Sequence, residues 1–194
     1  MGFVRSFIAC GIDQALVPRI REIQDTLKAE SDSAGVKWID PENLHFTLKF
    51  LGEIDEGIIA NIREGIMGVA ESASSFDLAI SGLGAFPSVS RPRVIWLGTG
   101  NGKEKLRALA REIEEMSASY GIPKEGKVFV PHLTLGRVKS DHGLRGLAET
   151  IQRLASVEVG ITRVSEICLM RSDLKRSGPV YTVLECVRLT KQGK

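Results

Sequence analysis

The segment Val130-Pro-His-Leu-Thr-Leu-Gly-Arg137 places an imidazole, a hydroxyl and a guanidinium close together in the chain. Its apolar and polar residues alternate, which is typical of a β-strand with one buried face. Successive side chains of a strand point to opposite faces, so His132 and Thr134 share one face while Leu133 and Leu135 share the other. We expect the two leucines to enter a core and the His–Thr pair to face away from it.

A second copy of this pattern occurs in Leu44-His-Phe-Thr-Leu48, where His45 and Thr47 share one face and Phe46 and Leu48 share the other. A single His-x-Thr pattern on a half-buried strand is most simply interpreted as a structural histidine. The chain contains three histidines, however, and two of them stand in the same pattern. The two segments are therefore candidates for parts of one functional site.

Length and composition predict a compact globular protein. The chain has 194 residues, of which 43% are hydrophobic and 26% charged, and this is enough to bury a substantial core. A formal net charge of +2 is too small for a protein that coats nucleic acid. It does allow an anionic ligand to bind at a locally basic cleft.

The cysteines and the N-terminal segment predict the compartment. Cys10, Cys168 and Cys186 are widely spaced among apolar residues, so we expect three buried free thiols in a reducing environment. The apolar run that begins the sequence is too short for a signal peptide, and no transmembrane segment follows it. We therefore expect a cytoplasmic protein with no membrane partner.

Hydrophobic periodicity predicts several strands and helices in each half of the chain. We expect an α+β protein in which helices cover the outside of two antiparallel sheets. Each half carries one His-x-Thr-Leu motif, at 45–48 and 132–135, so residues 1–194 are expected to form a single bilobal catalytic domain with an approximate internal duplication. Strands are expected over 3–10, 36–39, 43–52, 76–80, 94–97, 128–138, 157–161, 164–170 and 180–189. A loop is expected over 82–92. Helices are expected to be capped by Asp55, by Asn101 and by Ser140 or Asp141.

Two facing His-x-Thr strands suit the cleavage of a phosphodiester. One group must take a proton from the entering oxygen, while another, on the opposite side of phosphorus, gives a proton to the leaving oxygen. Histidine has an ordinary pKa of about 6.5, so one copy can be neutral and the other protonated near neutral pH. His45 and His132 could supply both groups without a metal.

Three further side chains of the motifs could bind the phosphate. The hydroxyls of Thr47 and Thr134 could donate to its non-bridging oxygens, and Arg137 could add a charge there. On an ideal strand Arg137 points away from Thr134, so a bulge near Gly136 would be needed to bring it round. Without that bulge, Arg137 would be an ordinary solvent-facing arginine.

The paired motifs, with Phe50-Leu-Gly52 after the first and Arg137 after the second, resemble the two-histidine phosphoesterase superfamily. Within it, the chain most resembles the LigT-like RNA 2′,3′-cyclic phosphodiesterases, also named 2′-5′ RNA ligases. The resemblance extends over nearly the whole chain and includes the opening Arg5-Ser-Phe-Ile-Ala9, the strand Arg91–Gly98 and the run Leu169–Tyr181.

This resemblance implies a bilobal fold with a central cleft lined by two pseudo-symmetric sheets. It implies hydrolysis of a terminal 2′,3′-cyclic phosphate to a 2′-phosphate, with a reversible 2′-5′ joining activity. By analogy, His132 is the base that activates water and His45 is the acid that protonates the departing 3′ oxygen. Substrates would be RNA ends or nucleoside 2′,3′-cyclic phosphates. Phe50 and Tyr181 could stack on a base, although both are more simply interpreted as core residues.

Two alternatives stay open at this point. A zinc site at His45 and His132 is poorly supported, because neither motif offers a carboxylate or thiolate at ligand spacing, and we expect no metal or other cofactor. A non-catalytic module that binds RNA ends could use the same phosphate pocket.

The third histidine, His142, has no threonine partner and is expected to be exposed. We expect a monomer, since no long exposed apolar stripe is evident.

Overall fold

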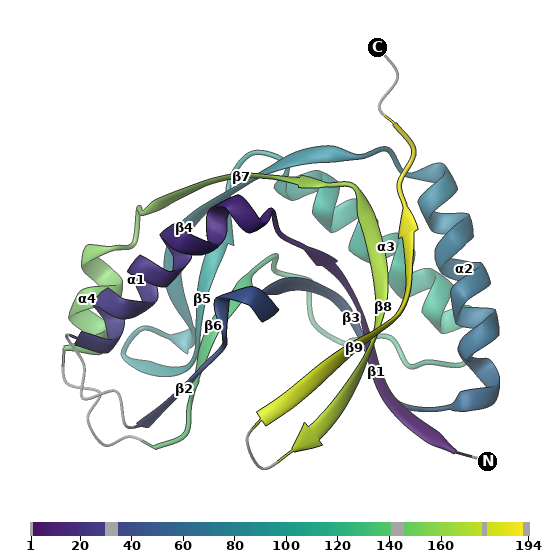
Figure 1. Cartoon of the computed structure of the whole chain (residues 1–194), viewed down its shortest axis with the longest axis horizontal. Helices are drawn as coiled ribbons and strands as arrows, with labels where there is room; N and C mark the ends of the chain where they lie inside the picture. The colour runs from purple at the N-terminus through teal and green to yellow at the C-terminus, as the bar shows by residue number, and fades with distance from the viewer. Residues whose placement is uncertain (1, 30–34, 141–145, 176–177, 192–194) are drawn as a thin grey trace.

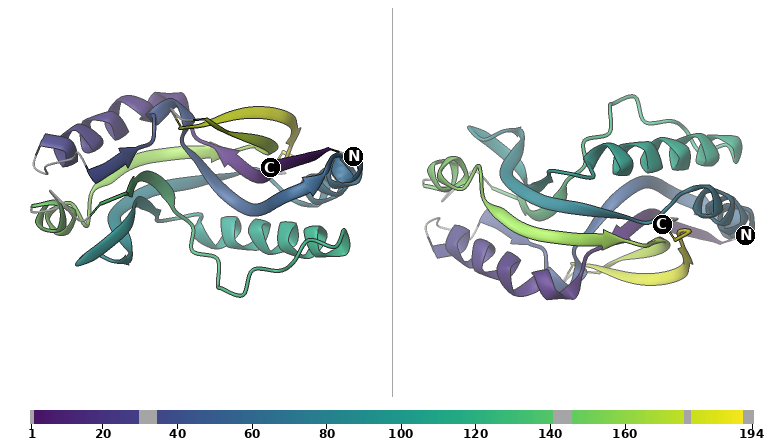
Figure 2. Two further views of the ribbon diagram at one scale, coloured as in Figure 1. Left: turned by 90° about the horizontal axis from the view of Figure 1, so that it is seen from below. Right: turned by 90° about the horizontal axis from the view of Figure 1, so that it is seen from above.

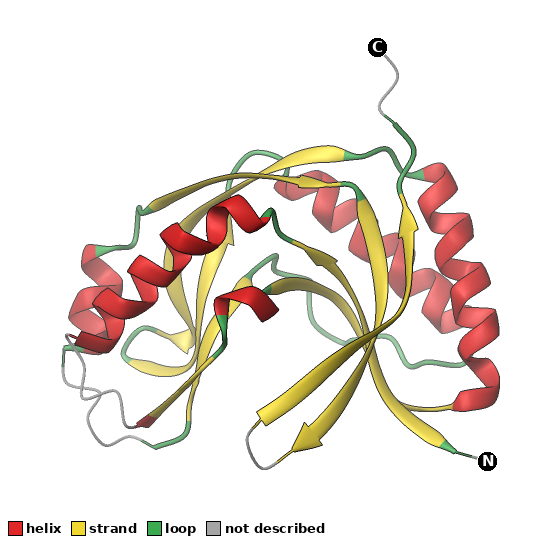
Figure 3. Ribbon diagram, in the orientation of Figure 1, coloured by secondary structure: helices red, strands yellow, loops and turns green. Residues whose placement is uncertain are grey.

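The computed structural model describes residues 2–29, 35–140, 146–175 and 178–191, and these form two antiparallel sheets with helices on the outside (Figures 1 and 3). This confirms the predicted α+β fold. Sheet A has the order β3 (His45–Asp55), β1 (Phe3–Gly11), β8 (Glu166–Lys175), β9 (Gly178–Arg188), and sheet B has the order β2 (Val36–Trp38), β6 (Leu133–Val138), β5 (Arg91–Thr99), β4 (Phe76–Ser88), β7 (Glu158–Val164).

The helices divide between the two sheets (Figure 2). α2 (Ile59–Ser72) and α3 (Lys103–Ser119) pack against each other and against strands of sheet A. α1 (Val17–Ala29) and α4 (Leu147–Arg153) contact each other, and α4 packs on β4 of sheet B. Short 3-10 turns, η1 (Gln14–Leu16), η3 (Pro41–Asn43) and η4 (Glu56–Ile58), lead into α1, β3 and α2. No helix in the described ranges has both the length and the apolar character required to span a membrane.

Each sheet contains one of the two motifs. Thr47 lies on β3 in sheet A, and Thr134 lies on β6 in sheet B, yet β3 and β6 contact each other. The side chains predicted to enter the core do so, since Phe46, Leu133 and Leu135 are fully buried. Burying these faces leaves the two His–Thr faces free to form a shared site.

Strand β3 does not alternate regularly after its motif. Thr47 pairs with Ala9 and Lys49 with Ile8, so Leu48 is a bulged residue with no partner on β1. The bulge reverses the faces of the residues that follow it. Lys49 therefore turns toward α3 and is only 1% exposed, while Phe50 turns to the opposite face and is 51% exposed.

Lys49 is stabilised in this buried position by two partners, a carboxylate and a backbone carbonyl. Its Nζ lies 2.8 Å from Oε2 of Glu114 on α3, and it donates a hydrogen bond of 2.8 Å to the carbonyl of Pro123. Glu114 is 20% exposed, so the carboxylate, but not the ammonium, reaches solvent. The pair joins the motif strand to the helix behind it.

Removing the two partners is expected to have unequal effects. Glu114→Ala leaves a buried ammonium without its counter-ion and should lower the free energy of unfolding by about 3 kcal/mol. Lys49→Met leaves a carboxylate that water can reach, and methionine fills the vacated space, so the loss should be about 1 kcal/mol. Urea denaturation measures both, with Glu104→Ala as the control because Glu104 forms an exposed pair on the same helix. A greater loss for Lys49→Met would contradict this assignment.

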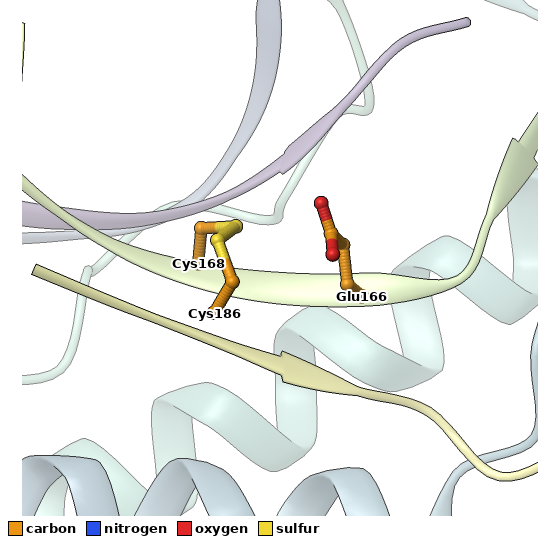
Figure 4. A group of neighbouring side chains, drawn as sticks. All are labelled: Glu166, Cys168 and Cys186. Carbon is orange, nitrogen blue, oxygen red and sulfur yellow. A yellow bond between two sulfur atoms is a disulfide. The ribbon is translucent and has the colours of Figure 1, made fainter. Parts of the chain in front are cut away.

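The cysteines differ from the sequence prediction. Cys10 is a buried free thiol, as expected, and its pKa is raised to about 12, mainly by burial and also by the charge of Glu166. Cys168 and Cys186 are not free, because they are direct partners on β8 and β9 and form a disulfide (Figure 4). Glu166 lies beside them, but both sulfurs are bonded to each other, so this group does not offer thiolate ligands.

Several element boundaries also differ from prediction. Residues 82–92, expected to be a loop, are mostly strand, because β4 continues to Ser88 and pairs with β5 in a long hairpin. β6 begins at Leu133 and not at 128. Asn101 does not cap α3, whose N-cap is Gly102, whereas the Asp55 side chain does accept from Gly57 N at the start of η4. Ser140 does not cap α4 either, because the N-cap of that helix is Gly146, and Asp141 and His142 lie outside the described residues.

Candidate active site

A cavity of about 590 Å³ lies between the two sheets, and both motifs contribute to its walls. This volume is within the range of small-molecule sites. Sheet A supplies His45, Thr47, Phe50 and Tyr181, and sheet B supplies Thr134 and Arg137. Six of the seven predicted site residues therefore line one cavity. The seventh, His132, is half-buried and is not among the lining residues.

The His45 ring is held by its backbone and by two aromatic rings. Its Nδ1 lies 2.9 Å from the carbonyl oxygen of Asn43. A carbonyl only accepts, so Nδ1 carries the proton and donates, which leaves Nε2 available to a substrate. Phe7 stacks on the ring at a centroid distance of 4.9 Å, and Tyr181 meets it edge-on at 5.2 Å.

The His132 ring has the same arrangement. Its Nδ1 lies 2.8 Å from the carbonyl oxygen of Val130, again two residues earlier in the chain, and therefore donates to it. Phe86 meets the ring edge-on at 5.1 Å. Both motif histidines thus present Nε2 as the nitrogen that can exchange a proton with a ligand.

The pKa values of both histidines are lowered for the same reasons. Burial is the largest cause for each, the hydrogen bond to the backbone carbonyl partly offsets it, and the positive charge of Arg137 lowers the pKa further. The same guanidinium acts on the hydroxyl of Tyr181, whose pKa is nevertheless raised by burial. Arg137, which lines the cavity, is therefore a charged neighbour of both imidazoles.

Arg137 reaches the cavity because β6 has the bulge that its predicted role required. Thr134 pairs with Trp96 and Gly136 with Ile95, so Leu135 is the bulged residue. The carbonyl of Leu135 is not left without a donor, since it accepts hydrogen bonds from the buried Gln24 side chain at 3.0 Å and from Ile39 N at 2.9 Å. The bulge turns Arg137 to the side of Thr134.

Sequence reasoning missed several residues of the cavity. Phe7 supports His45, and Arg5 from the same strand lines the wall. Lys37, Lys139 and Lys175 line it as well. None of them belongs to a His-x-Thr-Leu motif. Arg5, Phe7 and Lys175 lie in the segments Arg5–Ala9 and Leu169–Tyr181, which carry the family resemblance, but only the folded chain shows that these segments meet at the cavity.

Comparisons with known proteins identify relatives along the whole chain. The model of the family described as LigT like Phosphoesterase matches residues 11–96 and again residues 97–181, one match for each motif. An RNA 2′,3′-cyclic phosphodiesterase of Methanothermobacter thermautotrophicus is 43% identical over 186 residues, covering 96% of this chain and 99% of the relative. One of Aquifex aeolicus is 37% identical over 187 residues, covering 95% and 97%.

Solved structures have the same fold. A protein of Thermus thermophilus superposes with a TM-score of 0.81 at 29% identity, covering 97% of this chain and 100% of that one. Escherichia coli LigT in complex with 3′-AMP superposes with a TM-score of 0.78 at 23% identity, covering 97% and 99%. At this level of identity, the second likeness supports the fold alone.

Proposed function

Because the chain belongs to the LigT-like phosphoesterase family, we propose that it hydrolyses the 2′,3′-cyclic phosphate at an RNA end and leaves a 2′-phosphate. One observation supports this most strongly. The two motif histidines hold the same tautomer, each fixed by a carbonyl two residues earlier, and one arginine acts on both. A pair of matched imidazoles around one cation suits acid–base chemistry on a phosphate.

In the proposed reaction, His132 Nε2 takes a proton from water as the water oxygen attacks phosphorus. The bond from phosphorus to the 3′ oxygen breaks on the opposite side, and His45 Nε2 gives its proton to that oxygen. The products are a 2′-phosphate and a free 3′ hydroxyl. His132 ends protonated and His45 neutral, and proton exchange with solvent restores the starting state.

The lowered pKa of His132 suits its proposed role as the base directly. A base must be neutral at working pH, and burial favours the neutral ring of His132. The acid must be protonated, and the negative charge of a bound phosphate raises the pKa of the neighbouring His45. Thr47 and Thr134 donate to the non-bridging oxygens, and Arg137 balances the charge that develops there.

The proposal also covers base binding, domain organisation, cofactors and cellular location. Phe50 and Tyr181 stack on the terminal base, and the two sheets work as one bilobal catalytic domain. No metal or other cofactor takes part, and the chain acts as a monomer in the cytoplasm without a membrane partner. Joining of 2′-5′ ends is the reverse of the same step.

Product analysis tests this function. An oligonucleotide ending in a 2′,3′-cyclic phosphate is incubated with the protein, with and without excess EDTA, and the ends are separated by chromatography. We expect a 2′-phosphate, formed at the same rate in chelator. A 3′-phosphate, or turnover that stops in EDTA and returns with added metal, would contradict the proposal. Tight binding without turnover would favour the non-catalytic module.

A further inference from the structure

The cavity walls carry more positive charge than one cyclic phosphate requires. Among the described residues, five cationic side chains line the cavity and no carboxylate does, and these cations are Arg5, Lys37, Arg137, Lys139 and Lys175. A cyclic phosphate diester carries a single negative charge, which the motif residues can already balance. The additional cations therefore indicate a ligand with more than one anionic group.

Within the part of the chain that the structure describes, these cations also have no acidic partners. The ion pairs there include none of the five, although cations elsewhere, such as Arg19, Arg63 and Arg163, are each paired with a carboxylate. Like charges directly opposite on neighbouring strands are destabilising. Lys37 on β2 and Arg137 on β6 are nevertheless direct cross-strand partners, so the sheet edge keeps an unfavourable pair that a bound anion would relieve.

Three of the cations lie next to one another on the sheet B side of the cavity. Arg137 acts on both imidazoles, Lys37 stands opposite it, and Lys139 is two residues further along the same chain segment. Residues two apart on an extended segment are about 7 Å apart and share a face. Lys139 is kept in line by its backbone N–H, which donates to the carbonyl of Gly35 at 2.7 Å.

The opposite wall of the cavity comes from sheet A. Arg5 on β1 and Lys175 at the end of β8 line it, beside the apolar Leu174. In Figure 1, the end of β8 and the start of β9 lie across from β2 and β6. The cations thus come from both walls of the cavity.

We propose that Lys37 and Lys139 form a second phosphate site, which binds the phosphodiester on the 5′ side of the terminal nucleotide. This inference rests on the proposed function. A 2′,3′-cyclic phosphate stands at the 3′ end of RNA, so every other phosphate of the chain lies on its 5′ side. The substrate is then the end of an RNA chain, and an isolated nucleoside 2′,3′-cyclic phosphate leaves this second site empty.

The test compares two substrates with the same terminal base, a nucleoside 2′,3′-cyclic phosphate with a free 5′ hydroxyl and a trinucleotide ending in a 2′,3′-cyclic phosphate. The double variant Lys37→Gln/Lys139→Gln should lose about tenfold more kcat/KM on the trinucleotide than on the nucleoside. Its plot of log kcat/KM against log salt for the trinucleotide should be shallower by about 0.7, which corresponds to one lost phosphate contact with a single strand.

Two control proteins isolate charge at this position. Lys105→Gln/Arg111→Gln removes two exposed cations from α3, which do not line the cavity, and should not change the ratio between substrates. Lys37→Arg/Lys139→Arg keeps the charge and should keep most of the preference for the trinucleotide. The arginine variant also tests for a folding defect. If it loses the preference for the trinucleotide and is also less stable to urea, the loss in the glutamine variant is due to misfolding and not to the missing charge.

The outcomes separate this inference from the function on which it rests. An equal loss on both substrates, or no loss on either, would overturn the second phosphate site while hydrolysis by the wild-type protein stands. Absence of turnover of both substrates by the wild-type protein would overturn the proposed function and this inference with it.

Discussion

Replacing either His45 or His132 by alanine is expected to lower kcat on a nucleoside 2′,3′-cyclic phosphate by about 10²- to 10⁴-fold, the usual contribution of a positioned acid or base. Each ring is fixed by its own carbonyl partner, so neither can take over the position of the other. Steady-state rates measure the effect. His142→Ala is the matched control, because this histidine has no threonine partner and is assigned no role.

Binding measurements separate chemistry from affinity in these variants. The threonines and Arg137 stay in place, so a nucleoside 2′-phosphate should still bind to both alanine variants in calorimetry. If either variant kept most of its rate, acid–base catalysis by the pair would be wrong.

The choice of leaving group assigns the two roles. A nitrophenyl phosphodiester releases a stable anion that needs no proton from an acid. On this substrate His45→Ala should recover most of its lost rate relative to wild type, and His132→Ala should not. Recovery in His132→Ala alone would reverse the proposed acid and base.

Arg137→Gln is expected to lower kcat/KM by about 10- to 100-fold, because a charge-assisted hydrogen bond to the phosphate is lost. It should also move the pH profile. Catalysis needs one histidine neutral and one protonated, so the free enzyme is most active between the two pKa values of the pair. Both pKa values are lowered from about 6.5, which places the optimum of kcat/KM below neutral pH.

The sign of that shift follows from the charge removed. Arg137 lowers the pKa of both histidines, so its removal raises both, and the bell-shaped profile moves to higher pH. The profile of kcat/KM between pH 4.5 and 9 measures this, with Arg111→Gln on α3 as the control. A flat profile for the wild-type protein, or a shift to lower pH in Arg137→Gln, would contradict the assignment.

The sequence predicted the fold class and the buried faces of both motif strands because both depend on alternation. Phe46 and Leu133 are buried behind Thr47 and Thr134, as a period of two requires. Alternation predicts only regular strands, however. The bulge at Leu48 exchanges the faces to which Lys49 and Phe50 point, and no residue in that segment indicates the bulge.

The bulge in β6 could be predicted only because the proposed role of Arg137 requires it, and no residue near Gly136 indicates it locally. The contact that satisfies it comes from elsewhere in the chain, since Gln24 on α1 donates to the carbonyl of the bulged Leu135. The disulfide was missed for a similar reason, because Cys168 and Cys186 become partners only through the register of β8 on β9. Contacts between distant segments decide these features, and the local pattern does not encode them.

The central claim is that the imidazoles of His45, on β3, and His132, directly before β6, act on one phosphate. A crystal structure of the protein with a nucleoside 2′-phosphate tests it most directly. We predict that Nε2 of His45 and Nε2 of His132 each lie about 3 Å from oxygens of the same phosphate, on opposite sides of phosphorus. A phosphate that contacts only one of the two rings, or that binds away from both, would contradict the account.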